Sequence, residues 1–286
     1  MKKFLLATVF SLAAFCTQAR AQTQGQTADA YPQTRTYADM TNPFYIPERG
    51  FMADSRVSYS RVKLDASINA PRQSGYRFLK NAKNFELSET LTYGITGTWA
   101  VYGTFAYDWT KKEGAASFRD WSWTIGTKVN TIDEAWRVQI GADVTRTDFT
   151  KWKGVINEDQ KDTHLYLMAG TETGEKVFAY TRIDYHNIDY GNEQQYDEFN
   201  VEGALHILAG QQTTADVGLR FTWDTLDHVR NKDLTFFAGG YMNIYQNMAL
   251  GVTADYTLAS SNNIKEPYSP DNQGTYTLGF NVKYEF

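Results

Sequence analysis

The side chains of this chain that could carry chemistry are few. Four histidines are present, at His164, His186, His206 and His228. Imidazole is a common general base and metal ligand near neutral pH. Asp184 lies two residues before His186, a spacing that puts both on one face of a strand, with Asp189 following. Asp227 directly precedes His228, in a segment expected to be a loop beside Asp224.

Hydrolysis through a covalent intermediate needs a hydroxyl or thiol nucleophile within reach of such a base. Neither Asp-His pair has a serine in a His-x-Ser arrangement nearby. The single cysteine, Cys16, lies in an apolar N-terminal segment that we expect to be removed, so the mature chain has no thiolate and no disulfide. No metal-ligand spacing and no glycine-rich phosphate loop is present, and we therefore expect no metal and no cofactor.

The elements that position these residues are predicted to be β-strands. Residues 275–286 alternate between two faces, as a strand with a period of two requires. The apolar face holds Tyr276, Leu278, Phe280, Val282, Tyr284 and Phe286. The polar face holds Thr275, Thr277, Gly279, Asn281, Lys283 and Glu285. This pattern favours a membrane barrel, with apolar side chains facing lipid and polar ones facing a lumen. A lipocalin-like barrel would invert the two faces.

Twelve strands are predicted from about residue 53 onward, with ten or fourteen as alternatives. Short connections are expected at residues 96–97, 131–133, 173–175, 210–212 and 245–247. Longer ones are expected at 70–83, 110–117, 150–161, 187–194, 226–231 and 260–272. Strict alternation of short and long connections is typical of an all-β, transmembrane, up-and-down antiparallel barrel, with tight turns on the periplasmic side.

Charged side chains of both signs fall on the polar faces of the predicted strands. The lumen-lining residues we expect are Lys128, Arg137, Asp143, Arg182, Asp184, Glu202, Asp216, Arg220, Asp255 and Lys283. Rows of one sign would predict ion selectivity. Mixed signs can instead pair across the wall and make it rigid, so the pattern leaves open either a conduction path or a structural ion-pair network.

The N-terminal region is predicted to be exported and processed. Lys2 and Lys3 precede an apolar run over residues 4–15, and Ala19-Arg20-Ala21 fits a cleavage site. We therefore expect a signal peptide at 1–21, a periplasmic extension or short plug at 22–52, and a barrel at 53–286. The segment Asn42-Pro43-Phe44-Tyr45-Ile46-Pro47 is predicted either to enter the barrel mouth or to rest on the barrel base.

Composition agrees with a barrel. The mean hydropathy is −0.50, yet aromatic residues make up 15% of the chain. A barrel hides its hydrophobicity in alternation and carries aromatic girdles, which explains both values. The formal charge of −5 becomes −8 when Lys2, Lys3 and Arg20 are removed. This acidic balance argues against a nucleic-acid partner.

Two strands fit the pattern less well. Glu89 shares a face with Phe85, Leu87 and Leu91. A carboxylate facing lipid is costly, so we predict either a bulge in this strand or a protein–protein contact at Glu89. In the first strand the apolar face changes sides, and a bulge near Ser60-Arg61 would reconcile the two halves.

On these residues the chain resembles the Gram-negative outer-membrane β-barrels. Its last residues, Thr277, Gly279, Val282, Tyr284 and Phe286, resemble the assembly signal of that class. The resemblance implies recognition by the outer-membrane assembly machinery and contact with membrane lipids and lipopolysaccharide. It leaves the oligomeric state unknown.

Three functions are consistent with this class. The first is a passive, porin-like channel for small solutes. The second is a structural or adhesive surface barrel with an occluded lumen, in which a basic loop contacts lipid phosphates through Arg72, Arg77, Lys80 and Lys83. The third, which the scarcity of candidate bases disfavours, is an outer-membrane lipid hydrolase or protease. An autotransporter would need a larger passenger than residues 22–52.

Overall fold

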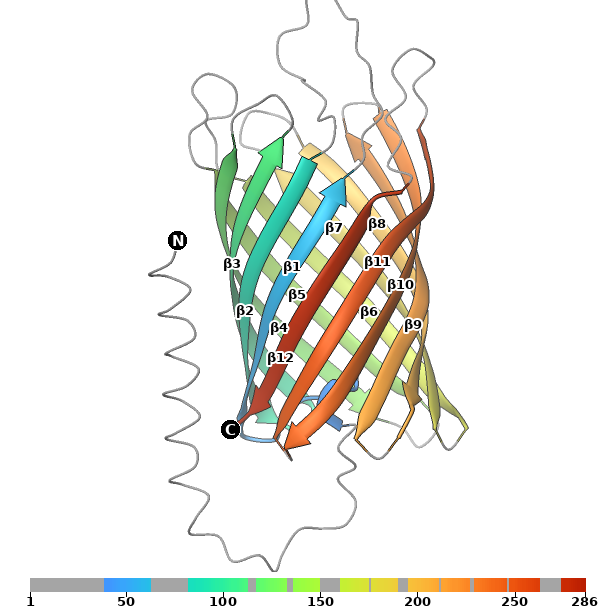
Figure 1. Ribbon diagram of the computed structural model, residues 1–286. Coiled ribbons are helices and arrows are strands. Elements are labelled where there is room, and N and C mark those ends of the chain that lie inside the picture. The colour runs from blue at the N-terminus through green and yellow to red at the C-terminus, as the bar shows by residue number, and fades with distance from the viewer. Residues whose placement is uncertain are drawn as a thin grey trace, which may run out of the picture. The chain divides into compact units, whose positions relative to one another are not determined.

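The computed structural model shows a closed barrel of twelve antiparallel strands (Figure 1). It describes residues 39–62, 82–112, 117–132, 136–149, 160–174, 176–189, 195–210, 212–226, 229–245, 247–262 and 274–286. A short 3-10 helix, η1 (Asp39–Thr41), precedes the strands. The strands are β1 (Phe51–Val62), β2 (Ala82–Thr96), β3 (Trp99–Lys112), β4 (Phe118–Ile132), β5 (Arg137–Phe149), β6 (Gln160–Gly174), β7 (Val177–Asp189), β8 (Gln195–Leu208), β9 (Thr213–Leu226), β10 (Val229–Tyr245), β11 (Met248–Asn262) and β12 (Tyr276–Glu285).

Each strand pairs with the strands next to it in sequence, and β1 pairs with β12 to close the barrel. The predicted fold class and the count of twelve are therefore confirmed, and the alternatives of ten and fourteen strands are wrong. Closure removes the unpaired edges that an open sheet would present. Within the described part of the chain, no helix has the length and apolar character needed to cross a membrane.

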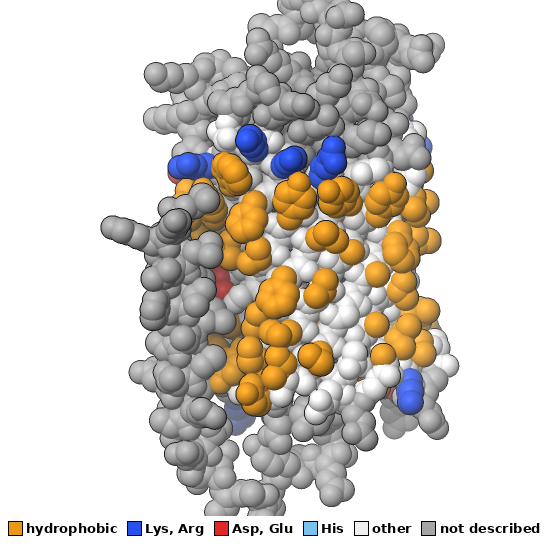
Figure 2. Space-filling view, in the orientation of Figure 1, with side chains coloured by type: hydrophobic (Ala, Val, Ile, Leu, Met, Phe, Trp, Pro, Cys, Tyr) orange, Lys and Arg blue, Asp and Glu red, His pale blue; other side chains and the backbone are white. Residues whose placement is uncertain are grey.

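The outer face of the barrel is apolar, as the alternation predicted. Many large apolar side chains are exposed there, because alternate residues of each strand point outward. Figure 2 shows hydrophobic side chains spread over the visible wall, with most of the visible Lys and Arg side chains in a row near one end. The outward residues include Trp99, Phe105, Trp123, Ile125, Ile140, Leu165, Leu219, Phe221, Val252 and Phe280.

The two ends of the barrel differ. At one end, which we call the turn end, consecutive strands are joined by tight connections such as residues 97–98 and 246–247. At the other end, the loop end, most connections are longer. The connection between β9 and β10 is an exception, since only residues 227–228 separate Leu226 from Val229. The expected long loop at 226–231 is wrong, because Leu226 and residues 229–231 belong to the ladder instead.

Two predicted irregularities are absent from the ladder. Strand β1 pairs with β2 and β12 through Arg61 without a register shift, so the bulge near Ser60-Arg61 is wrong. Strand β2 also runs without a shift past Glu89, and the bulge proposed there is wrong too. Glu89 therefore points outward, opposite Phe105, and accepts a hydrogen bond of 2.5 Å from the Ser55 hydroxyl. A neighbouring hydroxyl, rather than a bulge, lowers the cost of this carboxylate.

Candidate functional site: the barrel lumen

The lumen wall is the part of the fold that could handle a polar ligand. The charged residues predicted to line it all lie on the inner face of their strands. Lys128 and Arg137 come from β4 and β5, and Asp143 lies further along β5. Strand β7 supplies Arg182 and Asp184, β8 supplies Glu202, and β9 supplies Asp216 and Arg220. Asp255 lies on β11 and Lys283 on β12.

Three of these residues form one row across neighbouring strands. Arg182 pairs with Glu202, and Glu202 pairs with Arg220. The Arg220 guanidinium donates to Glu202 Oε2 from Nε at 3.0 Å and from Nη2 at 2.9 Å. Such charge-assisted bonds hold a guanidinium in a fixed orientation. The row therefore fixes a line of charge on the lumen wall.

The arginines are open to the lumen, whereas their carboxylate partners are buried. The side chains of Arg182 and Arg220 are 34% and 37% exposed, while those of Asp184 and Glu202 are 10% and 11% exposed. Arg137 is 38% exposed and lies 3.6 Å from the more exposed Glu172. The guanidinium groups of Arg182 and Arg220 also lie over the rings of Tyr166 and Phe237. At Arg182 and Arg220 the wall thus presents cations to the lumen and keeps their carboxylate partners behind them.

A second group of cations lies on other strands. Lys283 Nζ is 3.8 Å from Asp54 Oδ2 and 5.0 Å from the centre of the Tyr241 ring. The charge of Lys128 is repelled by those of Lys283 and Arg182 and attracted by that of Asp54. Among the described residues, no carboxylate lies within ion-pair distance of Lys128.

Acidic residues gather on the inner face toward the loop end. Glu86, Asp108 and Asp120 occupy adjacent positions on β2, β3 and β4. Glu198 pairs with Asp224 across β8 and β9. Asp162 on β6 and Asp233 on β10 complete this set. We call these residues the acidic rim: Glu86, Asp108, Asp120, Asp162, Glu198, Asp224 and Asp233.

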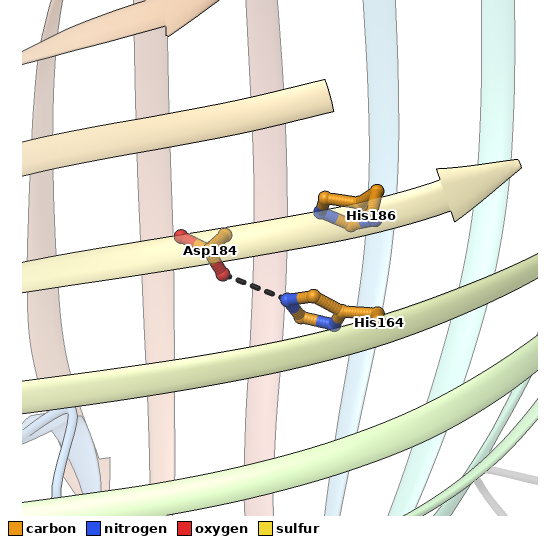
Figure 3. Close-up of side chains that lie close together, drawn as sticks. All are labelled: His164, Asp184 and His186. Carbon is orange, nitrogen blue, oxygen red and sulfur yellow. Dashed lines mark hydrogen bonds and ion pairs between the residues drawn. The ribbon is translucent and has the colours of Figure 1, made fainter. Parts of the chain in front are cut away.

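Next to the acidic rim, the β5–β6–β7 wall brings two histidines together. His164 and His186 are directly opposite each other on β6 and β7, and their rings stack with centroids 4.1 Å apart and planes at 2°. Asp184 Oδ1 lies 2.8 Å from His164 Nε2 (Figure 3). Asp143 Oδ2 lies 2.8 Å from His164 Nδ1 and also accepts a 2.5 Å hydrogen bond from the Tyr102 hydroxyl.

This arrangement differs from the one that the sequence suggested. Asp184 bonds to His164 and to Arg182, not to His186, its neighbour in sequence. His186 Nδ1 instead lies 3.0 Å from Asp162 Oδ2. The third described histidine, His206, is separate and bonds to Asp216 at 2.8 Å. Sequence reasoning named His164 but missed its partners, because they lie on neighbouring strands, where only the pairing register brings them close.

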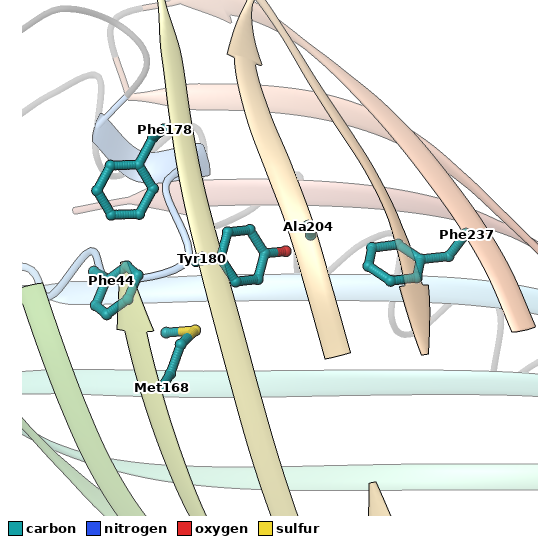
Figure 4. Packing of buried hydrophobic residues seen from close by; sticks show 6 residues of the cluster. All are labelled: Phe44, Met168, Phe178, Tyr180, Ala204 and Phe237. Atoms are coloured by element: carbon teal, nitrogen blue, oxygen red, sulfur yellow. The ribbon is translucent and has the colours of Figure 1, made fainter. Parts of the chain in front are cut away.

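The turn end of the lumen is occupied by η1 and the segment that joins it to β1. Phe44, Ile46 and Met40 are buried there. Figure 4 shows Phe44 beside Phe178, and the two rings meet edge to face with centroids 5.4 Å apart. The Asn130 side chain donates to the Phe44 carbonyl at 2.5 Å, and Thr214 donates to Thr41 at 3.0 Å. The segment therefore contacts the inner wall on several strands.

Several predicted features fall outside the described residues. These are the signal peptide at 1–21, the extension up to residue 38, Asp227-His228, and the basic residues Arg72, Arg77 and Lys80. Within the proposed assembly signal, Thr277 and Gly279 point inward and Val282 and Tyr284 point outward. Thr277 shares a hydrogen bond of 2.8 Å with Ser60 across the β1–β12 closure.

The fold matches solved barrels of bacterial outer membranes. An outer membrane channel from Pseudomonas putida F1 has a TM-score of 0.60 and 15% identity, covering 86% of this chain and 98% of that one. The β-domain of a Bordetella autotransporter has a TM-score of 0.55 at 11% identity, over 83% and 100% of the chains. The translocator domain of NalP from Neisseria meningitidis has 0.51 at 10%, over 95% and 98%. The chain therefore has the fold of the outer-membrane β-barrels.

These likenesses concern structure alone. No protein-family model and no curated protein sequence matches this chain.

Proposed function

We propose that this protein is a passive channel for small solutes in the bacterial outer membrane. The exposure of the lumen arginines supports this most directly, since Arg137, Arg182 and Arg220 are each 34–38% exposed although they point into the barrel. Water-accessible charge inside a closed barrel requires solvent space along the wall. The Pseudomonas putida barrel that shares this fold is an outer membrane channel, which agrees with the proposal.

In the outer membrane, the protein would contact lipids, lipopolysaccharide and the assembly machinery. The apolar outer face would contact the acyl chains of the membrane, and its ends would meet headgroups and lipopolysaccharide. The C-terminal strand would be recognised by the outer-membrane assembly machinery, and the signal peptide would direct export.

The proposed role includes no catalytic step. Both ring nitrogens of His164 lie against carboxylates, and His186 Nδ1 lies against a third. Among the described residues, no serine or threonine hydroxyl bonds to either ring, whereas a nucleophile activated by histidine needs such a bond.

A structural or adhesive barrel with an occluded lumen is the second candidate. The observation that favours it is the segment at residues 40–47, whose Phe44 and Ile46 are 3% and 6% exposed within the turn end. In the channel proposal the same segment forms the constriction. The channel and the occluded barrel therefore differ in whether ions pass this segment.

Conductance of the purified full chain in a planar lipid bilayer separates them. We expect discrete current steps from the wild type, and larger steps from Phe44→Ala, which removes the ring packed on Phe178. Leu219→Ala, on the outer face, is the control and should conduct like the wild type. A closed trace from inserted wild type and from Phe44→Ala would contradict the channel and favour the occluded barrel.

A further inference from the structure

The histidine pair on the lumen wall has the composition of a transition-metal site. One ligand atom from each of His164, Asp184 and His186 lies within 4.8 Å of the other two. Two imidazoles and one carboxylate form a donor set that suits Zn²⁺, Ni²⁺ and related ions, whereas Mg²⁺ and Ca²⁺ prefer oxygen donors. We propose that His164, His186 and Asp184 bind one divalent transition-metal ion inside the barrel.

The backbone holds these three residues on one short stretch of wall. His164 and His186 are direct cross-strand partners, and Asp184 is two residues from His186 on the same inner face. Cross-strand partners have their Cβ atoms about 4.5–5.5 Å apart. The site is therefore built on paired strands, and because the two rings now lie parallel with centroids 4.1 Å apart, one imidazole must rotate for both Nε2 atoms to reach the same ion.

The distance between two donors also fits an ion. His164 Nε2 and Asp184 Oδ1 are 2.8 Å apart. Zinc bonds of about 2.0–2.2 Å, meeting at about 90–110°, hold two ligand atoms about 2.8–3.6 Å apart, so the observed distance lies at the short end of this range. A cation placed between Nε2 and Oδ1 would replace the proton that this hydrogen bond now holds.

Each histidine also has a carboxylate behind it. His164 Nδ1 faces Asp143, and His186 Nδ1 faces Asp162. In metal sites a carboxylate on the far nitrogen fixes the tautomer and presents the other nitrogen to the ion. Here both carboxylates are on Nδ1, which leaves both Nε2 atoms for the metal. Arg182 orients Asp184 through bonds of 2.7 and 2.8 Å to Oδ1 and of 3.1 Å to Oδ2, so an ion on Oδ1 would share this oxygen with the guanidinium.

The local charge favours a divalent cation. Asp143, Asp162 and Asp184 are opposed by the Arg182 guanidinium and the His164 ring, whose Nε2 proton the ion would replace. Asp162 Oδ1 is buried and lacks a hydrogen-bond partner, so negative charge there is incompletely satisfied. The acidic rim lies at the same end of the barrel and would concentrate cations at the site.

Metal binding can be measured on the full chain in detergent micelles, without any conduction. After treatment with a chelator, we expect isothermal titration calorimetry to show one Zn²⁺ or Ni²⁺ ion per chain and no comparable binding of Mg²⁺. His186→Gln and Asp184→Asn should each weaken Zn²⁺ binding at least about tenfold, and Asp143→Asn by about 10–100-fold. His206→Gln is the matched control, because His206 lies on the same inner wall but outside the cluster.

Equal weakening in His206→Gln and His186→Gln, or no binding to the wild type, would overturn the proposal. If the site variants do not fold, the unfolding temperature of the wild type still tests the proposal. Saturating Zn²⁺ should raise its unfolding temperature in micelles while equimolar Mg²⁺ leaves it unchanged, because only an ion bound to the folded barrel stabilises it. No rise with Zn²⁺ would reject the site. A closed channel that still binds Zn²⁺ would refute the proposed function and leave this inference intact.

Discussion

At the scale of single residues, Glu89 shows how a barrel tolerates a charge on its apolar wall. It lies at the middle of β2 and points outward, where it accepts a hydrogen bond from the Ser55 hydroxyl. A carboxylate at this depth costs less than Arg or Lys, which cost about 2–4 kcal/mol at the bilayer midplane. We expect Glu89→Leu to raise the free energy of unfolding by about 1–2 kcal/mol, measured by urea denaturation in lipid vesicles.

Leu91→Glu is the control for this substitution. Leu91 is 45% exposed on the same face of the same strand, so a carboxylate there should destabilise the barrel. If Glu89→Leu instead lowers stability and also dissociates an oligomer, Glu89 forms a protein–protein contact, which the sequence left open.

The two ion pairs that involve Arg220 and Arg137 should differ in strength because they differ in burial. Glu202 is 11% exposed and receives two short bonds from Arg220, whereas Glu172 is 73% exposed and 3.6 Å from Arg137. Glu202→Gln should lower the free energy of unfolding by about 1–3 kcal/mol, since charge-assisted bonds are lost at a buried site. Glu172→Gln should change it by less than about 1 kcal/mol. Equal changes in the free energy of unfolding for the two variants would show that burial does not determine the strength of these ion pairs.

At the scale of elements, the strands and their order were predictable, and the residue register between them was not. Alternation alone identified the inner and outer faces, because a period of two leaves little ambiguity over ten or more residues. Cross-strand partners depend on where each turn is centred. Moving a turn centre by one residue moves every partner by two. The turn expected at 173–175 was close to the observed one, but the pairing of His164 with His186 needed the register itself.

The N-terminal segment is held by a close approach that only glycine permits. A Cβ added at Gly94 would overlap the carbonyl oxygen of Pro47, and the Gly94 amide donates to Gly50 at 3.0 Å. Gly94→Ala must therefore displace the segment from the turn end. We expect a loss of about 1–3 kcal/mol in unfolding free energy, together with faster maleimide labelling of a Phe44→Cys side chain.

Gly203→Ala is the matched control, because a Cβ at Gly203 meets no atom within 4 Å. It should change the free energy of unfolding by less than about 0.5 kcal/mol and leave the labelling rate unaltered. Labelling at the wild-type rate in Gly94→Ala would mean that the segment does not depend on this contact.

At the scale of the whole molecule, one orientation accounts for the composition. The protein is polar on average because half of each strand faces the lumen, and aromatic-rich because the other half faces outward. Bulges were predicted at β1 and at Glu89 because every outward residue was expected to be apolar. The wall tolerates exceptions to this expectation. The closed ladder overrides such local mismatches, since each strand has to satisfy two neighbours.

The orientation itself is testable through the tryptophans. Trp99, Trp123, Trp136 and Trp223 are 41–54% exposed, and the three within strands lie on the outer face. In lipid vesicles, bromine atoms on the acyl chains should therefore quench most of the tryptophan emission, while aqueous acrylamide quenches little of it. Trp123→Phe should remove part of the bromine-sensitive signal, whereas Tyr166→Phe, on the inner wall, should leave it unchanged. Emission that acrylamide quenches and brominated lipid does not would place the aromatic face away from the membrane.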